Sequence, residues 1–231
     1  MKTVLVTGAN RGIGREVARQ LVARDCQVFI GARDAAAGRE TAETLGEKAK
    51  FLELDVLNEA SVTAAARAFQ ATGQHLDVLI NNAGIVDAHD TNILTVADVT
   101  VQRLLETNSL GARRVTRAFV PLLSRSVEPR IINISSEGGQ LSEGNNRRFA
   151  AYCLSKTMLN AITVQLAATL PKFAINAAHP GWVRTRLGTK FAPRSVEEGA
   201  DVIVWLALDA PQTLTGKFLH DRKEIPWAVS R

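Results

Sequence analysis

The feature that most constrains the fold is a regular alternation of short apolar, β-branched runs with longer amphipathic windows. The runs that predict strands are Thr3–Val6, Gln27–Ile30, Lys50–Leu54, Val78–Ile80, Arg130–Ile134, Ala174–Ala178 and a short one near Lys217–Leu219. The windows that predict helices are Ile13–Ala23, Ala35–Leu45, Glu59–Ala71, Val101–Leu123, Ala150–Leu170 and Val196–Leu208. This alternation is typical of a parallel sheet with helices on both faces. We therefore expect a doubly wound α/β fold with a parallel sheet of about seven strands.

Length and composition predict one domain over residues 1–231, because no proline- or serine-rich linker and no internal repeat divides the chain. The net charge is +5 and the pI is near 9.6. The basic residues are nevertheless scattered, the densest cluster being Lys217–Lys223, and aromatic residues make up only 5%. A nucleic-acid surface is expected to form a basic stripe, so we predict no nucleic-acid partner and assign some arginines to an anionic cofactor.

The cysteines and the apolar runs predict the cellular setting. Cys26 and Cys153 form no C-x-x-C pair and have no clustered histidines, so neither a disulfide nor a metal site is expected. No apolar run approaches the roughly 18 residues that a membrane span needs. Met1 and Lys2 lead directly into the first strand, so we expect no signal peptide, no membrane association and a cytoplasmic protein.

A glycine-rich turn follows the first predicted strand and opens the first helix, with the sequence Thr7-Gly8-Ala9-Asn10-Arg11-Gly12-Ile13-Gly14. Glycines at such a turn let the backbone approach a pyrophosphate, and the helix N-terminus offers free N–H groups to it. The spacing is G-x-x-x-G-x-G rather than G-x-G-x-x-G, and a plain glycine-rich turn is the alternative. Its placement between a strand and a helix favours dinucleotide binding.

The end of the second strand predicts which dinucleotide is bound. A protein that binds the ribose of NAD needs a carboxylate there, and Ala32 occupies that position. Arg33 follows it, and together with Arg11 it could flank a 2′-phosphate, which favours NADP(H). Two alternatives stay open: both arginines are solvated surface residues, or Asp34 binds the ribose because the strand is longer than expected.

Tyr152 and Lys156 lie one helical turn apart and therefore share a face of the predicted helix. A tyrosine pKa near 10 is too high for acid–base work at neutral pH, and a nearby ammonium is expected to lower it. Such a tyrosine could exchange a proton with a substrate oxygen. Taken alone, a pair with this spacing is more often a surface pair.

Two adjacent serines, Ser135 and Ser136, follow the fifth predicted strand. A hydroxyl here could stabilise negative charge on a substrate oxygen, although serines are also common where a strand turns into a loop. Strand alternation would put Ser136 on the face of Ile134, but the chain turns at this point and alternation alone does not decide. Taken alone, Asn108 inside the fourth helical window indicates an irregularity of the helix.

Four motifs together resemble the short-chain dehydrogenase/reductase family over essentially the whole chain: Thr7–Gly14, Asn81–Gly84, Tyr152-x-x-x-Lys156 and Pro180-Gly181. Arg11, Ala32-Arg33 and the tail Asp221–Trp227 are most similar to NADPH-dependent carbonyl reductases. The resemblance implies a single Rossmann-type domain with a cofactor half of about residues 1–130 and a catalytic and substrate half of about 131–231. It also implies an NADPH-dependent oxidoreductase that reduces a small-molecule ketone or aldehyde to an alcohol.

The same resemblance assigns roles to individual residues. The implied catalytic residues are Asn108, Ser136, Tyr152 and Lys156, with Ser135 left to structural hydrogen bonds. The implied cofactor contacts are Gly8, Asn10, Arg11, Gly12, Ile13, Gly14, Arg33, Asp55, Val56, Asn82, Ala83, Gly84, Tyr152, Lys156, Pro180, Gly181, Val183 and Thr185. Among these, Asp55-Val56 would bind adenine, Asn82–Gly84 would pass the adenosine ribose, and the residues from Pro180 to Thr185 would hold the nicotinamide carboxamide. His179 is expected to be structural.

Because of two departures from the family, the sequence predicts neither the shape of the substrate pocket nor whether the protein forms a homo-oligomer. The polar stretch Gly138–Arg148 is longer than in compact members, yet far shorter than the insertion of some monomeric carbonyl reductases. The segment Arg186–Arg194 is short, so any lid over the substrate is small.

Several alternative functions remain at this point. One is a non-catalytic NADP(H) sensor on the same fold, and another is an NAD-preferring alcohol or steroid-type dehydrogenase. A sugar-nucleotide epimerase is disfavoured because only about 46 residues follow Thr185. An enoyl reductase is disfavoured by the close spacing of the tyrosine and the lysine.

Overall fold

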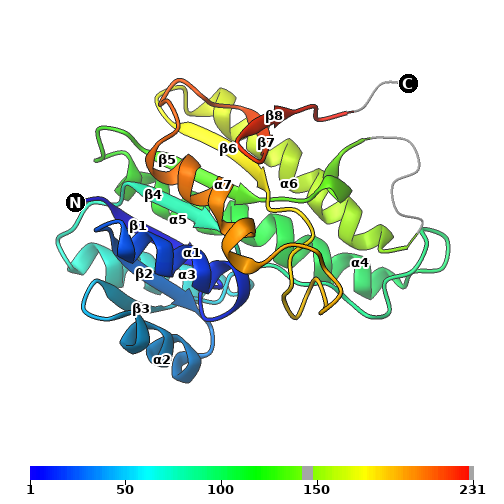
Figure 1. Cartoon of the computed structure of the whole chain (residues 1–231), viewed down its shortest axis with the longest axis horizontal. Helices are drawn as coiled ribbons and strands as arrows, with labels where there is room; N and C mark the ends of the chain where they lie inside the picture. Colours follow the sequence, from blue (N-terminus) through cyan, green and yellow to red (C-terminus); the bar gives the residue numbers. More distant parts are fainter. Residues whose placement is uncertain (142–147, 229–231) are drawn as a thin grey trace.

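One mixed sheet forms the centre of the molecule in the computed structural model, which describes residues 1–141 and 148–228. Its eight strands have the order β3-β2-β1-β4-β5-β6-β7-β8 (Figure 1). Their bounds are β1 Thr3–Thr7, β2 Gln27–Ala32, β3 Ala49–Glu53, β4 Val78–Asn81, β5 Arg130–Ile134, β6 Ala174–His179, β7 Lys217–His220 and β8 Lys223–Ile225. The order reverses at β1, which pairs in parallel with both β2 and β4.

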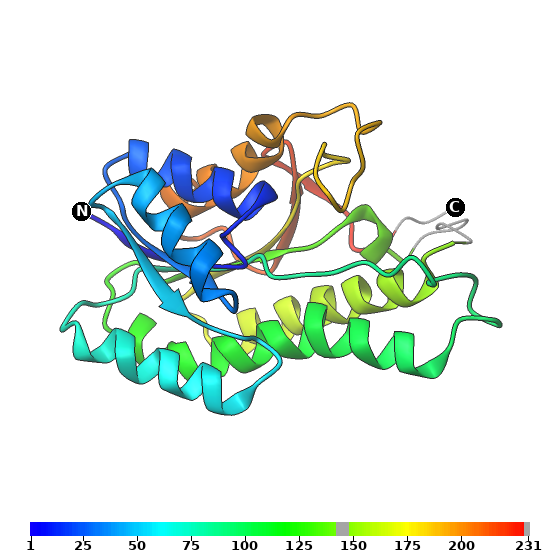
Figure 2. The same cartoon turned by 90° about the horizontal axis from the view of Figure 1, so that it is seen from below.

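Helices cover both faces of this sheet, as Figure 2 shows. One face carries α1 (Gly12–Ala23), α2 (Ala35–Leu45) and α7 (Val196–Leu208). The other carries α3 (Glu59–Ala71), α4 (Asp98–Leu105), α5 (Gly111–Leu123) and α6 (Ala150–Thr169). The predicted doubly wound, single-domain α/β fold is therefore confirmed.

Two apolar clusters fill the spaces between the sheet and its helices. Successive side chains of a strand point to opposite faces, so Val4 and Val6 pack with α1 and α7, whereas Leu5 packs with α3 and α5. Val4, Leu5 and Val6 are all fully buried. Burial on both faces explains why the strands are continuous apolar runs rather than alternating ones.

The eighth strand was not expected, and it runs antiparallel to β7. The two strands are joined by Asp221 and Arg222, which both have positive φ, at 47° and 61°. Such a two-residue turn usually contains Asn-Gly or Asp-Gly. The sequence offers no glycine here and the strand has only three residues, so neither signal for a hairpin is present.

The fourth helical window also differs from the prediction of one uninterrupted helix. It begins three residues earlier than expected, at Asp98, and contains a π-helical segment, η1, over Glu106–Leu110. An extra residue in a helical turn is frequently found at functional sites. The irregularity predicted at Asn108 is therefore present, since Asn108 lies within η1.

Candidate active site

The sequence-predicted site residues gather at the carboxyl ends of neighbouring parallel strands. Gly8 to Gly14 follow β1, Arg33 follows β2, Asp55 and Val56 follow β3, and Asn82 to Gly84 follow β4. Ser136 follows β5, and Pro180 to Thr185 follow β6, while Asn108 lies in η1, and Tyr152 and Lys156 on α6. Parallel strands end at one edge of a sheet, so this edge brings segments that are distant in sequence together.

The glycine loop after β1 packs against the loop after β4. Gly8 has a φ of +63°, and a Cβ there would lie 3.0 Å from Cα of Ala83. A Cβ on Gly14 would lie 2.3 Å from Nδ2 of Asn82. That Nδ2 donates to the carbonyls of Thr7 and Gly8, at 2.8 and 3.1 Å. The close approach therefore requires glycine and is held by the Asn82 amide.

The first turn of α1 has the properties of an anion-binding site. Its N-cap residue, Arg11, makes no side-chain capping bond, and the turn contains no acidic residue. The first N–H groups of a helix have no partner within the helix, so here they are left for a ligand. Gly12 begins the helix, and the methyl group of Thr185 would lie 3.6 Å from a Cβ on Gly12. The loop after β6 thus closes over the same turn.

The end of β2 bears on the alternatives for Asp34, because the strand runs two residues beyond the predicted Gln27–Ile30. The strand ends at the buried Ala32, and Asp34 is the N-cap of α2, where its carboxylate accepts from the Ala37 N–H at 3.1 Å. Arg33 is exposed on a surface pocket of about 440 Å³ lined by Arg33, Asp34, Glu53, Asp55, Asn58 and Ser61. Within residues 1–141 and 148–228, neither Arg11 nor Arg33 takes part in an ion pair. Asp34 already has a partner, whereas both guanidinium groups are open to an anion.

Ser136 and Ser135 point in different directions. A Cβ on Gly138 would lie 3.6 Å from the Ser136 hydroxyl oxygen and 3.9 Å from Cε1 of Tyr152, so both side chains lie beside the same glycine. The Ser135 hydroxyl instead donates to Oδ1 of Asn160, at 2.6 Å, and is buried. The backbone is still extended at Ser136, two residues beyond β5, and of the two serines it is Ser136 that lies beside Tyr152.

The pKa of Tyr152 is raised to about 12, chiefly because burial disfavours the phenolate, while the contact with Ser136 opposes that rise. This direction is opposite to the one predicted from the sequence. The Lys156 ammonium lies 5.7 Å from the centroid of the tyrosine ring and donates to the Ile134 carbonyl at 2.7 Å. Its hydrogen bond is therefore made to the end of β5 rather than to the phenol oxygen.

Lys156 is itself buried, and this burial lowers its pKa to about 8. A Cβ on Gly84 would lie 3.7 Å from its ammonium and 3.3 Å from Oδ1 of Asn108. The loop after β4 therefore passes directly over both side chains. A lysine whose ammonium is shielded in this way can lose its charge within two pH units of neutrality.

Asn108 connects three segments of the site. Its Nδ2 donates to the Ile85 carbonyl at 2.9 Å and to the Ser155 hydroxyl at 3.0 Å, and its Oδ1 accepts from the Ile85 N–H at 2.8 Å. It thereby fixes the loop after β4 against α6. The extra residue of η1 turns this side chain toward the site while η1 continues directly into α5.

Sequence reasoning missed Asp90 and Ser155. The carboxylate of Asp90 accepts from the N–H groups of Ala151 and Tyr152, at 2.9 and 2.8 Å, and so caps α6. Phe149, the N-cap residue, has a φ of 61° and makes no capping bond. Phe149, directly before Ala150, is not a Ser, Thr, Asp or Asn, and this indicates that the cap comes from elsewhere in the chain. For Ser155, the sequence carries no comparable signal.

His179 and Gly181 shape the start of the loop after β6. Burial lowers the pKa of His179 to about 4, so the ring is neutral near pH 7. Its Nδ1 accepts from the Gly181 N–H at 3.3 Å, and its ring stacks on His220 with centroids 4.5 Å apart. These contacts are structural, as expected from the sequence.

Fold and site together define a doubly wound α/β protein with a glycine-rich loop after β1 and a cluster formed by Ser136, after β5, with Tyr152 and Lys156 of α6. The chain matches the short chain dehydrogenase family over residues 2–195, and it belongs to that family. None of the helices in the described ranges is long and apolar enough to cross a membrane.

Known relatives act on alcohols and ketones. The chain is 33% identical to (+)-neomenthol dehydrogenase of Arabidopsis thaliana, covering 96% of each chain. It is similar to the NADPH-bound carbonyl reductase from chicken fatty liver, with 28% identity, a TM-score of 0.89 and coverage of 98% and 99%. The carbonyl reductase Sniffer of D. melanogaster has 28% identity, a TM-score of 0.88 and coverage of 99% and 100%. The family and these relatives support a nicotinamide-dependent oxidoreductase acting on a ketone or an alcohol.

The burial of Lys156 predicts a specific pH dependence of stability. Its pKa falls from the usual 10.5 to about 8 on folding, so between these values the unfolded chain binds more protons and stability rises with pH. We expect Lys156→Met to be more stable than the wild type at pH 7 by about 1–3 kcal/mol. This advantage should shrink toward pH 10.

Urea unfolding at several pH values between 7 and 10 measures the effect, with the exposed Lys172→Met as the control. A stability difference between Lys156→Met and the wild type that does not change over this range would contradict the assignment.

Proposed function

We propose that the chain is an NADPH-dependent reductase that converts a ketone or aldehyde to an alcohol, with Tyr152 as the proton donor. The observation that carries this proposal is that the side chains of Ser136 and Tyr152 lie beside the same glycine, Gly138, near the buried ammonium of Lys156. A proton donor, a second hydroxyl and a positive charge are the groups that carbonyl reduction needs around one oxygen atom. A plain structural cluster would not need a buried ammonium that has no carboxylate partner among the described residues.

The cofactor fits the residues at the strand ends. The glycine loop and the uncapped start of α1 suit a pyrophosphate, because a Cβ at Gly8 or Gly14 would fill the space between the loops. Arg11 and Arg33 would hold the 2′-phosphate, and residues 180–185 the nicotinamide end. The adenosine part would lie along Asp55, Val56 and the loop 82–84. NADPH supplies the hydride when it is bound.

Tyr152 and Ser136 share the work at the substrate oxygen. Burial keeps the Tyr152 phenol protonated near pH 7, and the charge of Lys156 must offset this burial for the phenol to give up its proton. The hydroxyl proton passes to the oxygen of the carbonyl group as that oxygen gains negative charge, and Ser136 donates a hydrogen bond to the same oxygen. The product is an alcohol, and Tyr152 is left as a phenolate.

Lys156 and Asn108 support the state that follows proton transfer. The ammonium stabilises the phenolate of Tyr152 through its charge, which acts strongly because Lys156 is buried and Tyr152 is half-buried. A phenolate beside Lys156 in turn favours the charged lysine and counteracts its lowered pKa. Asn108 holds Ile85 and Ser155 in place around this pair. We also expect the Lys156 ammonium to bind the ribose next to the nicotinamide.

NAD is the competing cofactor. A solved relative, the 3-oxoacyl-[acyl-carrier protein] reductase of Brucella melitensis, has NAD bound, with 27% identity and a TM-score of 0.83. Glu53 lines the pocket beside Arg33 and is exposed, so a carboxylate is available there. We favour NADPH because Asp34 already caps α2, whereas Arg33 has no acidic partner among the described residues.

Replacement of Tyr152 by phenylalanine tests the proton donor. We expect the variant to fold and to bind NADPH but to lose about 10²–10⁴-fold in kcat, because a positioned general acid is removed. NADPH oxidation with a panel of aldehydes, aromatic ketones, quinones and keto esters measures the loss. Retention of more than about a tenth of the wild-type rate would mean that another group supplies the proton.

The two serines provide a matched pair of variants. Ser136→Ala removes a donor to the developing oxyanion and should lower kcat by about 10²–10³-fold with little change in NADPH affinity. Ser135→Ala breaks the buried bond to Asn160 and should lower the free energy of unfolding by about 1–3 kcal/mol, with at most a few-fold change in kcat. Both are measured on one ketone and by urea unfolding. A larger loss of kcat in Ser135→Ala would reverse the assignment.

Arg33→Ala and Asp34→Ala separate the two cofactor hypotheses. Removal of the Arg33 guanidinium should raise the KM for NADPH roughly tenfold or more and leave the KM for NADH nearly unchanged. Loss of the Asp34 cap should lower stability by about 1 kcal/mol without changing the preference between cofactors. Steady-state kinetics with both cofactors test this. Equal use of NADH and NADPH by the wild type would assign the ribose to an acidic residue instead.

A further inference from the structure

Both the backbone and the side chain of Arg194 contact the loop after β6. Its backbone forms a bridge with Val183, since Arg194 N–H donates to the Trp182 carbonyl at 3.2 Å and its carbonyl accepts from Arg184 N–H at 2.9 Å. Its side chain covers Gly181, where a Cβ would lie only 2.4 Å from Cδ of Arg194. Gly181 has a φ of +81°, so the loop turns sharply beneath this side chain.

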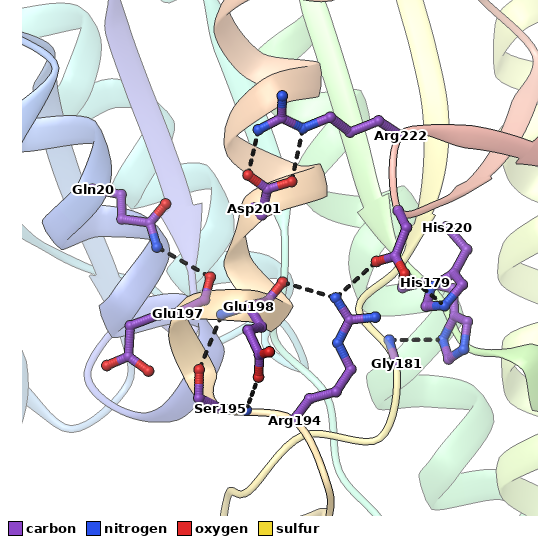
Figure 3. Close-up of polar contacts among 11 residues, drawn as sticks. Gln20, His179, Gly181, Arg194, Ser195, Glu197, Glu198, Asp201, His220 and Arg222 are labelled. Atoms are coloured by element: carbon purple, nitrogen blue, oxygen red, sulfur yellow. Dashed lines mark hydrogen bonds and ion pairs between the residues drawn. The ribbon is translucent and has the colours of Figure 1, made fainter.

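The guanidinium of Arg194 is anchored at the other end by two further segments. It forms an ion pair with Asp221 at 2.7 Å and donates to the Glu198 carbonyl at 3.2 Å. Asp221 belongs to the turn between β7 and β8, and Glu198 lies in the first turn of α7. Figure 3 shows Arg194 between Glu198 and Gly181. One side chain therefore connects the C-terminal hairpin and α7 to residues 181–185.

This arrangement is more than a surface ion pair. An exposed pair contributes only about 0–1 kcal/mol to stability, and the side chains of Arg194 and Asp221 are 24% and 54% exposed. The Nε of Arg194 is nevertheless buried and has no hydrogen-bond partner among the described residues, because the side chain lies along the loop at Gly181. These contacts therefore hold the loop in place and add little to the free energy of unfolding.

We propose that Arg194, held by Asp221, is a positioning residue that keeps residues 181–185 in place for the nicotinamide end of the cofactor. The proposal rests on the proposed function, in which this loop holds the nicotinamide. Arg194 acts through Gly181 and Val183. The C-terminal hairpin thereby contributes to cofactor geometry although none of its residues was assigned to the site.

A second arginine–aspartate pair in the same region provides a matched control. Arg222 pairs with Asp201 through two N–H groups, one of them at 2.7 Å, and so joins the same hairpin turn to the same helix, α7. Figure 3 shows Arg222 and Asp201 beside α7. Among the described residues, Arg222 forms no hydrogen bond or ion pair with residues 181–185.

The experiment compares Arg194→Ala, Arg194→Lys and Asp221→Asn with the controls Arg222→Ala and Asp201→Asn. For each variant we would measure the Kd for NADPH, the Kd for adenosine 2′,5′-bisphosphate, kcat with one ketone and urea unfolding. The bisphosphate lacks the nicotinamide. A loss of fold would weaken both ligands, whereas a displaced loop weakens NADPH alone.

We expect Arg194→Ala to weaken NADPH binding and to lower kcat, each by about tenfold or more, because small displacements of bound reactants are costly. Binding of the bisphosphate should stay within about twofold, Arg194→Lys should restore part of the loss, and Asp221→Asn should show a smaller effect of the same kind. The controls should match the wild type in all ligand measurements. Equal effects on both ligands, or equal effects in the controls, would overturn the proposal.

The result also separates this proposal from the proposed function. If the wild type binds NADPH and reduces ketones but Arg194→Ala does so equally well, only the role of Arg194 is wrong. If the wild type fails to bind NADPH while it binds NADH, the cofactor assignment is wrong, and the same variants measured with NADH and AMP decide the role of Arg194. If the wild type binds neither nicotinamide cofactor, both proposals are overturned together.

Discussion

The contact between the loops after β1 and β4 is the constraint on which the site depends. Gly8 and Gly14 leave no room for side chains, and the amide of Asn82 ties the two loops together. Because β1 and β4 are neighbours at the point where the strand order reverses, this contact sets the distance between the glycine loop after β1 and the segments that carry Ser136 and Tyr152. A glycine replaced here would shift these segments relative to each other.

Most of the fold followed from the apolar pattern, since strands buried on both faces and amphipathic helices differ strongly in period. What escaped the pattern were features set by tertiary contacts. β8 has a turn without glycine, the π-helical segment around Asn108 is a local change of winding, and Asp90 caps a helix from a remote loop. None of these has a period that a single sequence displays.

The grouping of the candidate site residues was predicted more completely than their electrostatics. Motif spacing alone predicted that Tyr152 and Lys156 share a face. The sequence could not predict that burial would raise the pKa of Tyr152 and lower that of Lys156, because a pKa depends on solvent exclusion by segments far apart in the chain. For Ser135 and Ser136, the deciding fact was the location of Asn160 beneath the strand end.

The capping of α6 by Asp90 has a consequence for the order in which the molecule assembles. The carboxylate that satisfies the N–H groups of Ala151 and Tyr152 is 61 and 62 residues away in the sequence. Closure of so long a chain segment is entropically costly and comes after local helix formation. The first turn of α6 is therefore completed late in folding, and when the native protein opens locally at Asp90, the turn that carries Tyr152 frays with it.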